Sequence, residues 1–90
     1  MTAALSIDNG EMALICFPYD GVDRKCEVFN SRTSISTFQT NHRHLGGKLA
    51  LYRGKPTTVG SYYGDVRNKV ESLTSSGWNV LNDFPKTYFK

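Results

Sequence analysis

Hydrophobic and polar residues alternate in short runs along the whole chain, and glycine, proline or asparagine interrupts nearly every run. Each run has the length of a β-strand rather than of a helix, and each is bounded by residues typical of turns. The runs cover residues 3–7, 12–17, 25–29 and 35–38 in the first half and residues 49–52, 56–59, 69–73 and 78–81 in the second. The pattern predicts eight short strands and an all-β fold.

The turn residues support this interpretation. Asn9-Gly10 is a strong hairpin signal, because both residues tolerate positive φ. The continuous apolar run 12–17 is typical of a strand buried on both faces. A helix competes in one place, since Val66, Val70 and Leu73 have helical spacing. The corresponding segment of the first half, 26–29, is richer in strand formers, which favours a strand.

An internal repeat relates the two halves. Sliding the sequence by 44 positions aligns identical residues in order: Leu5 with Leu49, Gly10 with Gly54, Tyr19 with Tyr63, Val22 with Val66, Lys25 with Lys69, Glu27 with Glu71, and Ser31 with Ser75. Such a period indicates tandem supersecondary units. The chain is therefore expected to divide into residues 1–44 and residues 45–90, with four strands in each unit.

The second unit resembles a kelch repeat. It has an apolar strand, a turn containing Gly54, a strand that ends at Gly60, a charged segment leading to Leu73, and then Trp78 before an exit that contains Pro85. Ser61 stands where the family has the second glycine of a pair, and the first unit, with Cys16-Phe17 at that place, diverges further. The resemblance implies two tandem four-stranded antiparallel blade-like units of a kelch-like β-propeller, which form an incomplete ring.

Two such units leave apolar faces uncovered, because each repeat buries its faces only against its neighbours. A propeller closes with roughly four to eight blades. We therefore expect this chain to be a fragment of a longer propeller or to associate with itself.

The charge and the lengths of the apolar runs exclude some classes of partner. The net charge of +3 is small and the basic residues are scattered, so neither a phosphate backbone nor any other nucleic-acid surface is an expected partner. No apolar run approaches the roughly 20 residues that span a bilayer, and residues 1–7 lack the features of a signal peptide. The compartment stays open, and an extracellular one would fit a paired Cys16 and Cys26 behind a truncated N-terminus.

Cys16 and Cys26 flank the turn near Gly21, and in a symmetric hairpin they would lie opposite each other. They could form a disulfide, which is typical of oxidising compartments, or remain two buried thiols. Their spacing does not suit a metal site.

No residue set predicts catalysis, a cofactor or a metal centre. His42 and His44 would share one face of a strand, but no third ligand lies nearby in the sequence, so exposed polar residues are expected. Gly46-Gly47-Lys48 lacks the hydroxyl residue and the earlier glycine of a P-loop. Glu27 and Glu71 occupy the same place in each unit, which indicates a shared structural role such as cross-strand pairing.

The function expected from the resemblance is a non-enzymatic protein-binding scaffold. The loops 18–24 and 61–68 combine aromatic and charged residues, a mixture suited to protein contacts: Tyr19, Arg24, Tyr62, Tyr63 and Arg67. The alternatives are a fragment of a propeller-containing oxidase, whose copper ligands would be gathered across the ring, and a small β domain unrelated to propellers.

Overall fold

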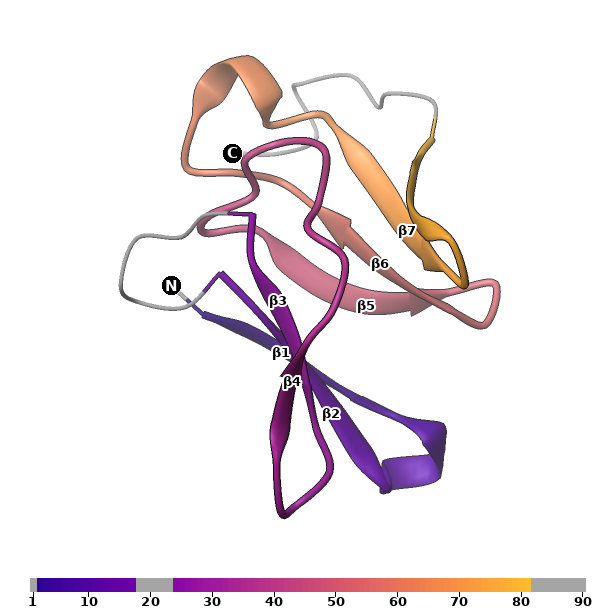
Figure 1. Ribbon diagram of the computed structural model, residues 1–90. Helices are drawn as coiled ribbons and strands as arrows, with labels where there is room; N and C mark the ends of the chain where they lie inside the picture. The colour runs from indigo at the N-terminus through magenta and orange to yellow at the C-terminus, as the bar shows by residue number, and fades with distance from the viewer. Residues whose placement is uncertain (1, 18–23, 82–90) are drawn as a thin grey trace.

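The computed structural model describes residues 2–17 and 24–81, and these form two four-stranded antiparallel sheets (Figure 1). In each sheet the strand order follows the sequence. The all-β class predicted from the sequence is confirmed. The first sheet contains β1 (Ala3–Ile7), β2 (Met12–Cys16), β3 (Cys26–Phe29) and β4 (Ser34–Ser36). The second contains β5 (Lys48–Tyr52), β6 (Lys55–Val59), β7 (Val70–Thr74) and β8 (Gly77–Val80).

The hairpin turns follow the local chemistry of the sequence. Asp8, Asn9 and Gly10 form a short 3-10 turn, η1 (Asp8–Gly10), in which all three residues have positive φ. Asx residues and glycine reach this region at the lowest cost. In the second sheet Arg53 and Gly54 form a two-residue turn, also at positive φ. A second 3-10 turn, η2 (Gly64–Val66), precedes β7, so the helix that competed over residues 65–75 is replaced by a strand.

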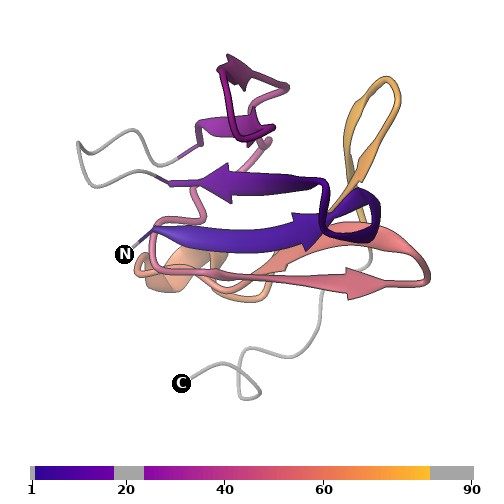
Figure 2. The ribbon, with the colours of Figure 1, turned by 90° about the horizontal axis from the view of Figure 1, so that it is seen from below.

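The two sheets pack face to face, and β1 lies beside β5 where they meet (Figures 1 and 2). The core between them consists of buried residues from both sheets: Ala3, Leu14, Cys16, Phe17, Cys26 and Trp78. Half-buried Val28, Leu49 and Leu73 pack against this cluster. One face of the first sheet therefore supplies most of the apolar contact.

The other face of the first sheet is more open than the sequence predicts. Ile15 and Ala13 on β2 are only half-buried, whereas Leu14 and Cys16 on the opposite face are fully buried. The apolar run 12–17 is thus buried on one face, and the prediction of burial on both faces is wrong. A single sheet packs against β2 within the described residues, and it covers only the face that carries Leu14 and Cys16.

The strand pairing also changes the repeat alignment. Cys16 pairs with Cys26 at the end of β2, and Val59 pairs with Val70 at the end of β6, so Cys16 and Val59 occupy equivalent places. The uniform offset instead aligned Ile15 with Val59. The loop between β1 and β2 has four residues and the loop between β5 and β6 has two, which shifts the first two strands of each sheet. The offset of 44 still holds for β3 and β7, where Cys26 matches Val70.

Candidate functional site

The junction between the sheets is organised by the segment that joins them, residues 37–47, which we call the linker. It leaves β4 and runs along the first sheet, where the N–H of Thr37 donates to the carbonyl of Cys26 and the N–H of Thr40 donates to the carbonyl of Arg24. It then crosses to the second sheet before β5 begins (Figure 1). Its path is set by hydrogen bonds rather than by apolar packing alone.

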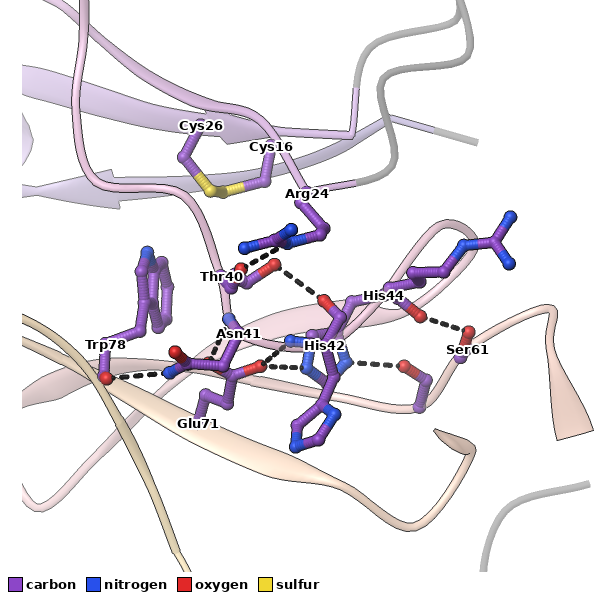
Figure 3. Close-up of polar contacts among 12 residues, drawn as sticks. Cys16, Arg24, Cys26, Thr40, Asn41, His42, His44, Ser61, Glu71 and Trp78 are labelled. Atoms are coloured by element: carbon purple, nitrogen blue, oxygen red, sulfur yellow. Dashed lines mark hydrogen bonds and ion pairs between the residues drawn. A yellow bond between two sulfur atoms is a disulfide. The ribbon is translucent and has the colours of Figure 1, made fainter. Parts of the chain in front are cut away.

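A buried carboxylate on β7 holds the linker in place (Figure 3). Oε1 of Glu71 accepts hydrogen bonds from the backbone N–H of Asn41 at 2.7 Å and from its side-chain amide at 2.9 Å. Oε2 accepts from the backbone N–H of His42 at 2.9 Å and lies 2.7 Å from Nε2 of His44. Glu71 has no exposed surface. Burying a carboxylate is costly unless charge-assisted hydrogen bonds compensate, and here four donors do so.

His44 is the buried side-chain partner of Glu71. Its Nδ1 lies 2.8 Å from the carbonyl oxygen of Gly60, which can only accept a hydrogen bond. Its Nε2 faces the Glu71 carboxylate. The His44 ring is thus held at both nitrogens, by the Gly60 carbonyl on one side and by the Glu71 carboxyl group on the other. His44 is fully buried, so the expectation of two exposed histidines is wrong for this residue.

The environment of Glu71 keeps it charged. Burial raises the pKa of the carboxyl group, but hydrogen bonds from the His44 ring and from the backbone of Asn41 and His42 outweigh that effect. The pKa of Glu71 is therefore lowered below its ordinary value of 4.5. The carboxylate is ionised at neutral pH, and the junction contains a fixed negative charge.

Trp78 also binds the linker, through its indole N–H and its backbone carbonyl. Its indole N–H donates to the carbonyl of Phe38 at 3.0 Å, and its own carbonyl accepts from the Asn41 side chain at 2.9 Å. The side chain is buried in the core between the sheets. A large ring with one polar group suits this place, where one side is apolar and the other contacts the linker backbone.

The disulfide predicted as one alternative is present. Cys16 and Cys26 are bonded, with their Cα atoms 4.1 Å apart as a directly paired residue couple of β2 and β3. Next to it, Nε of Arg24 donates to the carbonyl of Thr40 at 2.7 Å, so the base of the cross-linked hairpin is tied to the linker (Figure 3). Phe17, which is fully buried, packs its ring near His44. The disulfide hairpin thus forms one wall of the junction.

The loop between β6 and β7 contacts the linker from the other side. The guanidinium carbon of Arg43 lies 3.7 Å from the centre of the Tyr63 ring, and Tyr62 meets Tyr63 edge to face. The N–H of Tyr62 donates to the carbonyl of Leu45, and the Ser61 hydroxyl donates to the carbonyl of Arg43. Tyr62 remains 67% exposed. We call Arg43, Tyr62 and Tyr63 the rim cluster.

The predicted partner-contact residues are brought partly together. Arg24 lies on one side of the linker, and Tyr62 and Tyr63 lie on the other. Arg67 is half-buried after η2, where Gly64 lies next to its side chain. Tyr19 falls outside the described residues. Sequence reasoning missed Arg43, and also the Asn41, His44 and Glu71 network. The available signal was a glutamate, Glu71, inside the predicted strand 69–73.

Metal chemistry gains no support from the histidines. Both ring nitrogens of His44 are engaged in hydrogen bonds, so neither offers a lone pair to a metal. In residues 2–17 and 24–81 no three His, Cys, Asp or Glu side chains are grouped as metal ligands.

Residues 2–17 and 24–81 contain no helix long and apolar enough to cross a membrane. No protein-family model and no curated protein matches the sequence.

Proposed function

We propose that this chain is a non-enzymatic protein-binding scaffold built from two kelch-like β-propeller blades. The observation that carries the proposal is the rim cluster, held by a buried junction between two sheets of the same strand order. The sheets would supply stability and the rim would supply recognition.

The chemistry of the rim cluster fits a protein partner. Tyr and Arg are the residues most enriched in the energetically important centres of protein interfaces, because they combine a rigid apolar surface with directed hydrogen bonds. Here Arg43 is exposed with its guanidinium over the Tyr63 ring, which meets the exposed ring of Tyr62. A guanidinium group next to aromatic rings favours a partner segment that carries carboxylates among apolar side chains.

The anchored linker would keep this surface preorganised. Arg43 lies between Asn41-His42 and His44, all of which are fixed by Glu71. A surface that is rigid before binding loses less entropy on association. The disulfide adds to this rigidity and fits an extracellular or otherwise oxidising compartment.

The test compares the wild type with Tyr62→Ser, and with Ile35→Ser as the control. Both side chains are largely exposed, at 67% and 63%, but Ile35 lies on β4 away from the rim cluster. Proteins crosslinked to the wild-type chain are identified, and the purified partner is titrated against all three chains by calorimetry. Tyr62→Ser is expected to raise the Kd at least tenfold, the loss typical of a central aromatic residue, and Ile35→Ser to leave it unchanged. Equal Kd values for the three chains would overturn the proposal.

A further inference from the structure

Strand β4 is the last strand of the first sheet, and the hydrogen bonds at its two ends show which way its backbone groups point. The N–H of Thr37 donates to the carbonyl of Cys26 at one end, and the N–H of Asn30 donates to the carbonyl of Thr33 at the other. Hydrogen-bonded and non-hydrogen-bonded pairs alternate along an antiparallel ladder. Residues 33, 35 and 37 therefore direct their backbone groups toward β3, and residues 34 and 36 direct theirs away from it.

Ser34 and Ser36 thus present unpaired backbone groups at the edge of the sheet. Each has an N–H and a C=O that point away from β3, and no residue in 2–17 or 24–81 hydrogen-bonds to them. Both serines are exposed, and Ile35 between them is 63% exposed. Figure 2 shows β4 at the end of the first sheet that lies away from β5. A row of unpaired groups of this kind is a template for another strand.

The other edge strands of the two sheets have neighbours among the described residues. Strands β1 and β5 lie beside each other where the sheets meet. On β8 the carbonyl of Trp78 accepts a hydrogen bond from the Asn41 side chain. Edge strands that stay free in natural proteins commonly carry a lysine, a proline or a bulge. Residues 33–37 contain none of these, so nothing in the composition or the register of this edge prevents pairing.

The sequence of this edge reads the same in both directions. Residues 33–37 are Thr33, Ser34, Ile35, Ser36 and Thr37, a palindrome centred on the isoleucine. Two antiparallel copies related by a twofold axis at Ile35 align threonine with threonine, serine with serine, and Ile35 with itself. Cross-strand pairs of Thr or Ser stabilise a sheet, and no like charges meet because the five residues are uncharged.

We infer that the edge formed by residues 33–37 is the contact through which two copies of this chain form a twofold dimer. The serines then form the hydrogen-bonded pairs, since the N–H of Ser34 reaches the carbonyl of Ser36 in the second copy and the reverse bond closes the pair. The two Ile35 residues form the non-hydrogen-bonded pair between them, where side chains approach most closely. The contact joins two four-stranded sheets into one and covers an exposed apolar residue of each copy.

The geometry also sets the size and the strength of the assembly. Both copies use the same edge, so the contact is isologous and closes after two copies. It is small, because one short strand from each copy takes part, and small interfaces are typical of transient complexes. The dimer is therefore expected to exchange with the monomer at micromolar to millimolar concentrations. The inference depends on β4 alone and does not rest on the proposed function.

The experiment measures the mass of the full chain by sedimentation equilibrium over this range of concentrations. Ile35→Lys and Ile35→Glu each place like charges directly opposite each other across the twofold axis and remove the apolar contact. Leu51→Lys is the control, since Leu51 is an aliphatic strand residue of similar exposure, 58%, on β5. The CD spectrum and the Trp78 fluorescence verify that each variant is folded.

The wild type and Leu51→Lys are expected to dimerise with the same Kd, and each Ile35 variant alone is expected to raise that Kd about tenfold or more. An equimolar mixture of Ile35→Lys and Ile35→Glu is expected to dimerise again, because residue 35 of one copy lies opposite residue 35 of the other. A wild type that stays monomeric at millimolar concentration, Ile35 variants that associate like the wild type, or a mixture that stays monomeric would each overturn the inference.

The variants of the rim-cluster test keep the two proposals apart. Ile35→Ser is expected to weaken the dimer and to leave the Kd for the protein partner unchanged. Tyr62→Ser is expected to weaken partner binding and to leave the dimer unchanged. Loss of dimerisation in Tyr62→Ser, with Ile35→Ser unaffected, would place the contact between copies at the rim cluster and overturn the assignment to β4.

Discussion

Replacing Glu71 by glutamine tests whether the buried carboxylate holds the two sheets together. Glu71→Gln keeps the shape of the side chain but removes its charge. The four groups that now face two carboxylate oxygens would face one carbonyl and one amide group, and the His44 ring would lose its carboxylate partner. Removing one partner of a buried ion pair costs about 3–5 kcal/mol. A chain of 90 residues has a total stability of about 5–13 kcal/mol, so this loss is a large share of it.

The assay is urea unfolding followed by fluorescence and by far-UV CD. Trp78 is the single tryptophan of the chain, and it contacts both the core and the linker, so its emission reports on the junction itself. For a domain of this size the loss corresponds to a decrease in Tm of more than about 12 °C. Glu11→Gln, an identical substitution at an exposed residue, is the control and is expected to change the midpoint little. If both variants unfold at the same urea concentration, the carboxylate does not anchor the junction.

The same variant gives a test by pH. A carboxyl group whose pKa is lowered in the folded state stabilises the fold above its ordinary pKa and loses that contribution as the pH falls through the folded value. For Glu71 the unfolding free energy is therefore expected to be steady near neutral pH and to decrease below about 4.5. In Glu71→Gln the unfolding free energy should fall less at low pH than in the wild type. The decrease that remains in the variant includes the contribution of Glu27, whose pKa is lowered by the Ser34 hydroxyl and by Lys25. Identical pH profiles for the wild type and Glu71→Gln would contradict the assignment.

Three further predictions concern stability. Replacing both Cys16 and Cys26 by alanine opens a short loop and should lower the unfolding free energy by about 2–3 kcal/mol by the loop-entropy relation, and no change in the urea midpoint would contradict this. Thr58→Val should leave stability unchanged or raise it, because the buried Thr58 hydroxyl has no partner in the described protein. Thr57→Val, its neighbour, removes a hydroxyl bonded to Ser72 and should cost about 1–2 kcal/mol, so equal melts of the two variants would refute this. Gly47→Ala should destabilise by about 1–3 kcal/mol, since a Cβ there would lie 2.7 Å from the Gly60 carbonyl oxygen, and a wild-type melt would show that the linker can move aside.

The strands could be predicted because their signals are local. Alternation of apolar residues and the turn chemistry of Asn9-Gly10 and Arg53-Gly54 act over a few neighbours, and all eight runs became strands. The repeat could be detected, but its alignment failed on the first two strands of each sheet, because the hairpin loops differ by two residues. A single offset chosen from identical residues cannot detect that the first two strands of each sheet are shifted in opposite directions.

The junction could not be predicted because its partners come from distant and irregular segments. Asn41, His42 and His44 lie in a linker without periodicity, where a histidine is normally expected to be exposed. Only the position of Glu71, within a buried strand, hinted that its charge must be compensated. The disulfide stayed an open alternative for a related reason: the pairing of Cys16 with Cys26 depends on the hairpin register, which the spacing alone does not determine.

The position of Glu71 in the chain also has a consequence for the order of folding. Its hydrogen-bond donors precede it by 27 to 30 residues, so during synthesis the first sheet and the linker leave the ribosome before their anchor is made. The linker amides stay hydrated until β7 emerges, and the junction has to close a long loop to form. Contacts of this kind are expected to form late in folding. Glu71→Gln should then speed unfolding far more than it slows folding, with a φ-value near zero for the junction while the hairpins have higher values.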